Sequence, residues 1–233
     1  MNPSATLQTK VDDTVALLKR IAEEYSPATF ANSFGAEDMV LTDLINRHDI
    51  DIEIFSLDTG RLPEETYTLM QEVSDKYAKP IITYFPETTA VETYVREHGP
   101  NAFYDSIALR KRCCFIRKIE PLRRAIAGKK GWVTGLRREQ AVTRADLQAS
   151  EWDADNGLQK FNPLVEWTEK EVWQYLRDNK VPYNALHDKH YPSIGCAPCT
   201  RAISVGEDIR AGRWWWENPE SKECGLHAKA ANT

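Results

Sequence analysis

The feature that most constrains the fold is a repeated alternation between short apolar runs and stretches with helical periodicity. Strand-like runs cover residues 28–33, 52–57 and 81–85, and residues that suit a helix separate each run from the next. Strands that alternate with helices in this way build a parallel sheet with helices on both faces. We therefore expect an α/β protein with a doubly wound, mostly parallel sheet.

Several local signals sharpen this expectation. Residues 11–24 carry apolar side chains at helical spacing, and Pro63 suits the first turn of a helix. Residues 168–171 read Thr-Glu-Lys-Glu, a capping box that predicts a helix ending near Asn179. Further predicted elements are a helix after residue 36, a helix over residues 115–127 and a short strand over residues 132–134.

The chain shows no linker, repeat or low-complexity segment that would divide it. We expect one α/β domain over residues 1–210, rich in loops toward its C-terminal end. Residues 211–233 are expected to form a mobile tail.

The composition is that of an ordinary globular protein, with 42% hydrophobic and 28% charged residues in 233. No apolar run approaches the length of a bilayer span, and the first residues lack the pattern of a signal peptide. We therefore expect a cytoplasmic protein that does not bind membranes. The net charge of −5 also argues against a general nucleic-acid binder.

Basic side chains are concentrated between residues 110 and 144, where twelve Lys and Arg face only Glu120 and Glu139. A charge run of this kind is most often a solvated face. The alternative is a pocket for a compact and strongly anionic ligand. An RNA-binding surface is less favoured, because aromatic residues do not interleave with the basic ones.

Four of the five cysteines form two close pairs, Cys113-Cys114 and Cys196-Ala197-Pro198-Cys199. An odd total argues against a disulfide framework in a cytosolic chain. One alternative is that these cysteines are buried and have only a structural role. Another is that the Cys-x-x-Cys motif is redox-active or binds zinc. Adjacent cysteines suit tetrahedral zinc poorly, whereas an iron–sulfur cluster offers separated irons to neighbouring thiolates. The spacing therefore favours four-cysteine iron–sulfur ligation, with zinc and structural roles left open.

The fifth cysteine, Cys224, lies near the C-terminus between Lys222 and His227. Nearby positive charge lowers a thiol pKa and increases the reactive thiolate fraction. Cys224 is thus a candidate nucleophile, although a tail cysteine is often incidental. The preceding Trp214-Trp215-Trp216 run could dock or cover this segment.

Two strand-to-helix turns are candidate anion sites, because ligands of open α/β sheets bind at the carboxyl ends of the strands. One turn is residues 33–38, Ser-Phe-Gly-Ala-Glu-Asp, and the other is residues 57–61, Leu-Asp-Thr-Gly-Arg. Each signal is weak alone, since most α/β proteins contain turns with glycine.

Four motifs taken together resemble the assimilatory sulfonucleotide reductases, in particular the iron–sulfur branch that acts on adenosine 5′-phosphosulfate (APS). They are Lys-Arg-Cys-Cys at 111–114, Gly-Cys-Ala-Pro-Cys-Thr at 195–200, Arg-Trp-Trp-Trp-Glu at 213–217 and Lys-Glu-Cys-Gly-Leu-His at 222–227. The resemblance implies a fold like the adenine nucleotide alpha hydrolases. The 33–38 turn departs from the Ser-Gly-Gly-x-Asp-Ser pattern of ATP pyrophosphatases, which favours a different anion from pyrophosphate.

The resemblance also assigns roles to residues. A [4Fe-4S] cluster would be bound by Cys113, Cys114, Cys196 and Cys199 in the 1–210 domain, and Cys224 in the tail would be the catalytic nucleophile. The residues expected to bind substrate are Ser33, Gly35, Leu57, Asp58, Thr59, Gly60, Lys118, Arg144, Arg210, Arg213 and His227.

The implied activity is reduction of APS to sulfite and AMP through an S-sulfocysteine, with thioredoxin or a glutaredoxin-like dithiol as electron donor. It would serve sulfate assimilation and cysteine biosynthesis. The alternatives are a reductase specific for the 3′-phosphorylated substrate (PAPS), an ATP-dependent adenylating enzyme, and an iron–sulfur regulator that binds nucleic acid. The sequence leaves open whether the chain forms a homo-oligomer.

Overall fold

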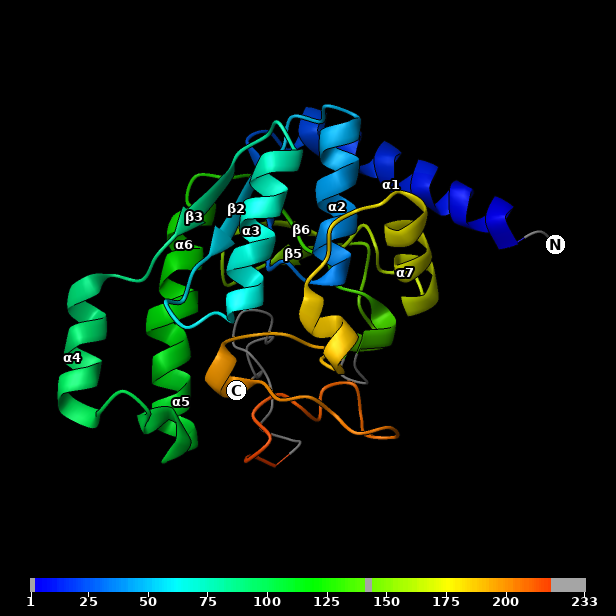
Figure 1. The fold of residues 1–233 in the computed structure, drawn as a ribbon. Helices are drawn as coiled ribbons and strands as arrows, with labels where there is room; N and C mark the ends of the chain where they lie inside the picture. Colours follow the sequence, from blue (N-terminus) through cyan, green and yellow to red (C-terminus); the bar gives the residue numbers. More distant parts are fainter. Residues whose placement is uncertain (1–2, 141–143, 219–233) are drawn as a thin grey trace. The chain divides into compact units, whose positions relative to one another are not determined.

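A computed structural model describes residues 3–140 and 144–218. Its central element is a six-stranded sheet with the strand order β3-β2-β1-β4-β6-β5 (Figure 1). The pairings β1–β2, β1–β4 and β4–β6 are parallel, whereas the edge strand β5 is antiparallel to β6. The strands are β1 (Ala28–Ala31), β2 (Glu53–Leu57), β3 (Ile81–Tyr84), β4 (Gly131–Val133), β5 (Ser150–Asp153) and β6 (Leu158–Phe161).

Most of the helices fall where the periodicity predicts them. Thr168 caps the last long helix through the predicted box, in which its hydroxyl accepts from the Glu171 amide. The helices α4 and α5 are elements that the sequence patterns did not predict. The helices are α1 (Pro3–Glu24), α2 (Ala36–Arg47), α3 (Glu64–Lys76), α4 (Thr88–His98), α5 (Ile107–Cys114), α6 (Glu120–Ile126) and α7 (Glu169–Asp178).

The chain groups into two compact units that interleave in sequence. The first unit comprises Met1–Ser56, Glu65–Ile82 and Gly128–Asn184. The second comprises Leu57–Glu64, Thr83–Ala127 and Ala185–Thr233. The expected division at residue 210 stays a prediction, because much of the proposed tail lies outside the described residues.

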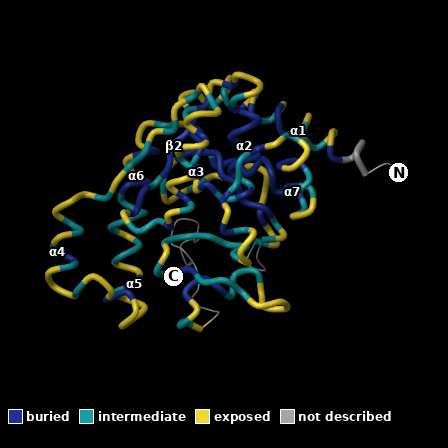
Figure 2. The backbone as a smooth tube through the Cα atoms, in the orientation of Figure 1, coloured by how far each residue is buried: buried dark blue, intermediate teal, exposed yellow. Residues whose placement is uncertain are grey.

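The first unit holds one continuous apolar core. It is built by β1, β2 and β4 together with one side of α1, α2, α3 and α7. The middle of β2 is coloured as buried in Figure 2. The apolar residues that predicted α2, Val40, Leu41, Leu44 and Ile45, are all buried. The hydrophobic pattern therefore locates α2 correctly, and the predicted mostly parallel α/β fold is confirmed.

The second unit contains a break in a predicted helix. Instead of one helix over residues 115–127, α5 ends at Cys114 and a π-helical turn over Phe115–Ile119 leads into α6. Pro121 explains the break, because its ring would collide with the carbonyl of Arg117 in a regular α-helix. The cysteine pair thus stands directly before a widened turn, a feature often found at functional sites.

Within the described ranges 3–140 and 144–218, no helix has both the length and the apolar character of a membrane span.

Candidate functional site

The strand order creates a candidate ligand site in the first unit. Strand β1 leads through the 33–38 turn into α2, and its neighbour β4 leads into the turn that begins at Thr134. Crossovers leave the sheet in opposite directions from such a pair, and ligands of α/β proteins bind at this position. The predicted residues Ser33 and Gly35 lie here, with Gly35 immediately preceding α2.

The 33–38 turn is closed by its own side chains. The Ser33 amide and hydroxyl both donate to Oδ2 of Asp38, at 2.7 and 2.6 Å. Asn32 accepts from the Phe34 amide at 2.6 Å, which supports the left-handed backbone of Phe34 at φ 61°. A carboxylate therefore already accepts from these two donors of Ser33, and the substrate-binding roles expected of Ser33 and Gly35 stay predictions.

Burial has a strong effect on Asp38. The side chain is buried, and loss of hydration raises its pKa to about 7, although the Ser33 hydrogen bonds act in the opposite direction. Asp38 therefore changes protonation near neutral pH. The sequence patterns gave Asp38 no role beyond membership of the turn.

The turn after β4 packs closely against α2. A Cβ atom at Gly135 would lie 2.1 Å from Oδ1 of Asp38, so this position has room for glycine alone. Two residues later, Nε of the buried Arg137 donates to Glu37 at 2.8 Å. These contacts join the two turns at the switch point of the sheet.

The same turn holds the predicted substrate residue Arg144. Oε1 of Gln140 accepts from the Arg137 amide at 3.0 Å and also from the Arg144 guanidinium. A chain of contacts thus runs from Glu37 through Arg137 and Gln140 to Arg144. Of these four residues only Arg144 was identified from sequence, because each pairing depends on how the chain folds.

In the second unit, the predicted nucleotide turn after β2 has a defined shape. The Asp58 carboxylate accepts from the Gly60 amide at 2.7 Å, and Gly60 has φ 69°, a conformation that glycine adopts readily. The Asp58 amide donates to the carbonyl of Tyr84 at 3.0 Å. Thr59 is fully buried, and Leu57 is the last residue of β2.

This turn contacts both cysteine-bearing segments. From the π-helical turn, Arg117 donates to the Thr59 carbonyl at 2.6 Å. From the Cys-x-x-Cys segment, Cys196 Sγ lies 3.3 Å from the Thr59 hydroxyl, and the Ala197 amide donates to the Arg61 carbonyl at 2.8 Å. Thr59, Arg117 and Cys196 therefore lie together in the second unit, and the expected roles of these segments in binding nucleotide and metal stay predictions.

Three of the cysteines share a small apolar cluster. Cys113, Cys196 and Cys199 pack there with Phe103, Trp214 and Trp216. No disulfide joins the four cysteines that the structure describes. In residues 3–140 and 144–218, no group of three or more His, Cys, Asp or Glu side chains meets the geometry for holding a metal ion.

The thiols nevertheless act on one another electrostatically. Burial raises the pKa of Cys199 to about 12, and Cys196 and Cys114 add to this effect while Arg213 and Lys118 oppose it. Burial also raises the pKa of Cys113, with Cys196 adding and Arg117 opposing. Burial therefore favours the protonated thiols over thiolates at these cysteines. A bound cation or metal group would instead favour the thiolate form.

Arg213, predicted to bind substrate, packs against the cysteine loop. Its guanidinium lies so close to Gly195 that a Cβ there would approach Nη2 to 2.3 Å. Nη1 donates to the Ile194 carbonyl at 3.2 Å, and the guanidinium stacks 4.7 Å from the ring of Trp214. Glycine at 195 is therefore required for this close approach.

The structure describes two more of the basic residues that are predicted to bind substrate. Lys118 lies in the π-helical turn, and the Arg210 carbonyl accepts from the Arg213 amide at 2.9 Å. Cys224 and His227 lie outside the described residues, so their roles stay predictions.

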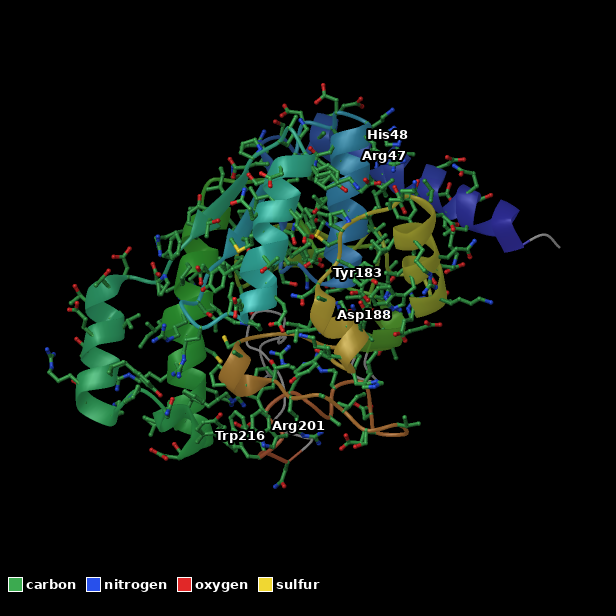
Figure 3. The ribbon with its side chains drawn as sticks, in the orientation of Figure 1. Arg47, His48, Tyr183, Asp188, Arg201 and Trp216 are labelled. Carbon is green, nitrogen blue, oxygen red and sulfur yellow. The ribbon has the colours of Figure 1, made fainter. Side chains whose placement is uncertain are left out.

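A buried ion pair that the sequence did not suggest lies beside the cysteines. Nε and Nη2 of Arg110 donate to the two Glu217 oxygens at 2.8 and 2.7 Å. Glu217 follows Trp216, which is labelled in Figure 3 and whose ring packs 4.5 Å from that of Tyr104. The C-terminal segment is therefore attached to α5 at the point where it leaves the described part of the chain.

Comparisons with known proteins agree on one family. A family model for the phosphoadenosine phosphosulfate reductase domain matches residues 27–202. An adenosine 5′-phosphosulfate reductase of Allochromatium vinosum is 57% identical over 224 residues, covering 96% of this chain and 88% of that protein.

Solved structures are similar in fold. The crystal structure of phosphoadenylyl-sulfate (PAPS) reductase from Candida auris in a phosphate complex has a TM-score of 0.70 and 27% identity, covering 82% of this chain and 90% of that chain. Yeast FAD synthetase in complex with FAD has a TM-score of 0.57 and 17% identity, covering 87% and 69%, which is a likeness of fold alone.

Proposed function

Because the chain belongs to the phosphoadenosine phosphosulfate reductase domain family, we propose that it reduces adenosine 5′-phosphosulfate to sulfite and AMP. The single observation that carries this proposal is the 57% identity, over nearly the whole chain, to an enzyme named for that reaction. The reaction would serve sulfate assimilation and cysteine biosynthesis in the cytoplasm.

The nucleotide would use the polar turns at the ends of the strands. In the second unit these residues are the Leu57–Gly60 turn and two basic side chains, Arg117 and Lys118. Both basic residues lie on the π-helical turn after the cysteine pair, and Arg117 donates to the Thr59 carbonyl. In the first unit Arg144 is held by Gln140. Guanidinium and ammonium groups are suited to phosphate and sulfate oxygens. Ser33, Gly35, Arg210, Arg213 and His227 complete the proposed binding set.

The four cysteines fit a [4Fe-4S] cluster by their chemistry. They are grouped in one unit, they influence one another's pKa, and Arg117, Lys118 and Arg213 supply the positive charge that thiolate ligands and a cluster would need. Ligands of a multi-iron group bind different irons, so they need not converge on one point. When bound, the cluster would order these loops and set the charge around the nucleotide.

The first chemical step is a transfer of the sulfonate group to Cys224. The thiolate attacks the sulfur of the APS sulfate, an S–S bond forms, and the S–O bond to AMP breaks with its electron pair leaving on the phosphate. Basic side chains that face the developing charge would stabilise this step electrostatically.

The second step releases sulfite. A thiolate of a dithiol protein of the thioredoxin or glutaredoxin type attacks the Cys224 sulfur, and sulfite leaves with the S–S electron pair. The second thiol of the donor then displaces Cys224 as a thiolate. The two electrons that reduce the sulfur therefore come from the dithiol, which becomes a disulfide.

An anaerobic assay with reduced thioredoxin tests this function. We expect sulfite and AMP in equal amounts from APS, and slower turnover of PAPS. Without reductant, mass spectrometry should find an SO₃ adduct on the peptide that contains Cys224. Sulfite formation with an unmodified Cys224 peptide would refute the covalent step, and faster turnover of PAPS would refute the substrate assignment.

A further inference from the structure

The geometry points to Arg110 and Glu217 as a positioning pair for Cys224: their ion pair anchors the segment that carries the nucleophile and ties it to the cysteine site. This inference rests on the proposed function, in which Cys224 attacks the substrate. Neither residue is expected to touch substrate, and Arg110 and Glu217 act through the chain that follows them.

The pair has the features of an anchor and not of a surface salt bridge. The side chains of Arg110 and Glu217 are only 1% and 3% exposed. Both carboxylate oxygens are used, and the Arg110 guanidinium also lies 4.8 Å from the centre of the Trp214 ring. Losing one partner would leave the other charge buried and unpaired, so the arrangement strongly favours one position of Glu217.

The anchor lies close to Cys224 in sequence. Six residues lie between Glu217 and Cys224, so a fully extended chain could place the Cα atom of Cys224 no more than about 25 Å from that of Glu217. A short connection from Cys224 to a fixed residue, Glu217, raises the effective concentration of the thiol at its target. The pair therefore favours productive approach of the nucleophile.

The anchor is connected to both cysteine pairs. On α5, Arg110 lies one helical turn before Cys114. On the other segment, the Trp214 amide donates to the Cys199 carbonyl at 3.2 Å. The segment from Trp214 to Glu217 is thus held by Arg110, which precedes one proposed cluster-binding pair on α5, and by Cys199 of the other pair. These contacts link the position of the nucleophile to an intact cysteine site.

The test is Glu217→Gln in the full-length, iron-loaded protein. The rate of SO₃ adduct formation at saturating APS, without reductant, is followed by mass spectrometry. We expect this rate to fall about 10-fold or more. The Kd for AMP should change less than about 2-fold, since the pair does not bind nucleotide, and the iron content should be unchanged. Amide hydrogen exchange at Trp214 and Glu217 should become faster, a readout independent of activity.

Two further variants keep the test decisive. Glu217→Asp retains the charge on a shorter side chain and should slow the adduct less, so it replaces Glu217→Gln if that variant does not fold. Glu207→Gln is the matched control, because it removes a carboxylate from the partly exposed pair with Arg201, labelled in Figure 3, and should leave the rate unchanged.

The outcomes separate this inference from the proposed function. A wild-type rate in both Glu217 variants overturns the anchor alone, as does an AMP Kd that rises as much as the rate falls. Absence of any adduct in the wild-type protein overturns the covalent step of the proposed function and the anchor together.

Discussion

Gly135 and Asp38 face each other so closely that a methyl group on Gly135 would stand 2.1 Å from a carboxylate oxygen. The carboxylate cannot withdraw easily, because Ser33 holds its other oxygen through two hydrogen bonds. The ends of β1 and β4 are therefore fitted to each other at the switch point of the sheet, and this contact depends on the absence of a side chain.

Replacing Gly135 with alanine should destabilise the protein. We expect the free energy of unfolding to fall by about 1–3 kcal/mol, the usual cost of overpacking a buried position. Urea denaturation measures this change. The matched control is Gly35→Ala, whose Cβ would lie 3.5 Å from the Ser33 hydroxyl, an ordinary contact. Equal stability of the two variants would contradict the close fit.

Asp38 should give the stability a pH dependence near neutrality. Burial raises its pKa to about 7, against about 3.9 for an unfolded carboxyl group. Between these values the native state holds a proton that the unfolded state has released, so stability falls as the pH rises. The loss for this group is at most about 4 kcal/mol and ends above its native pKa.

The Asp38→Asn variant tests this dependence, because it cannot ionise. Unfolding free energies of both proteins at pH 5 and pH 8 isolate the contribution of the single group, since the other carboxyls are shared. We expect the wild type to lose more stability than the variant between these values. Parallel curves would show that Asp38 does not titrate in this range.

Gln140 should act on nucleotide binding through Arg144. Truncation to alanine removes the acceptor that orders the guanidinium, and we expect the Kd for APS to rise about 3- to 10-fold, the cost of ordering one long side chain. In an Arg144→Ala background the same truncation should add nothing. Gln140→Glu keeps an acceptor and should bind nearly normally. Losses that add independently in the double variant would remove Gln140 from this role.

Cysteine variants should separate metal binding from catalysis. Cys196→Ser is expected to lose iron and activity together, because one proposed ligand is gone. Cys224→Ser is expected to keep its iron and its absorbance near roughly 400 nm, yet to release no sulfite. Iron analysis, absorption spectra and a sulfite assay on the same samples measure both effects. Sulfite release at the normal rate by Cys224→Ser would exclude it as the nucleophile.

The fold was largely predictable from sequence because its signals are local. Buried parallel strands read as short apolar runs, and the helix after Thr168 begins with a capping box that the structure contains. The family prediction, based on four motifs, is also confirmed. The edge hairpin β5–β6 was missed because strands of four residues with charged side chains give little alternation.

The contacts inside the site were much less predictable. The pairs Arg137–Glu37 and Arg110–Glu217 join residues 100 and 107 positions apart, and nothing in their local sequence distinguishes them from surface charges. Residue types indicated which cysteines and basic residues could act. Which arginine is buried against which carboxylate depends on tertiary packing, so Arg110, Arg137 and Gln140 could be identified only from the structure.

The widened turn over Phe115–Ile119 makes the chain sensitive to length at this point. Removing one residue there would turn α5 relative to α6, while Pro121 would still interrupt the helix between them. Each residue of an α-helix turns the chain by about 100°, so the cysteine pair would then face a different direction while the buried side of α6 kept its place. A shortened protein of this kind would keep its core and misplace the cysteines proposed as cluster ligands, which separates the requirement for folding from the requirement for chemistry.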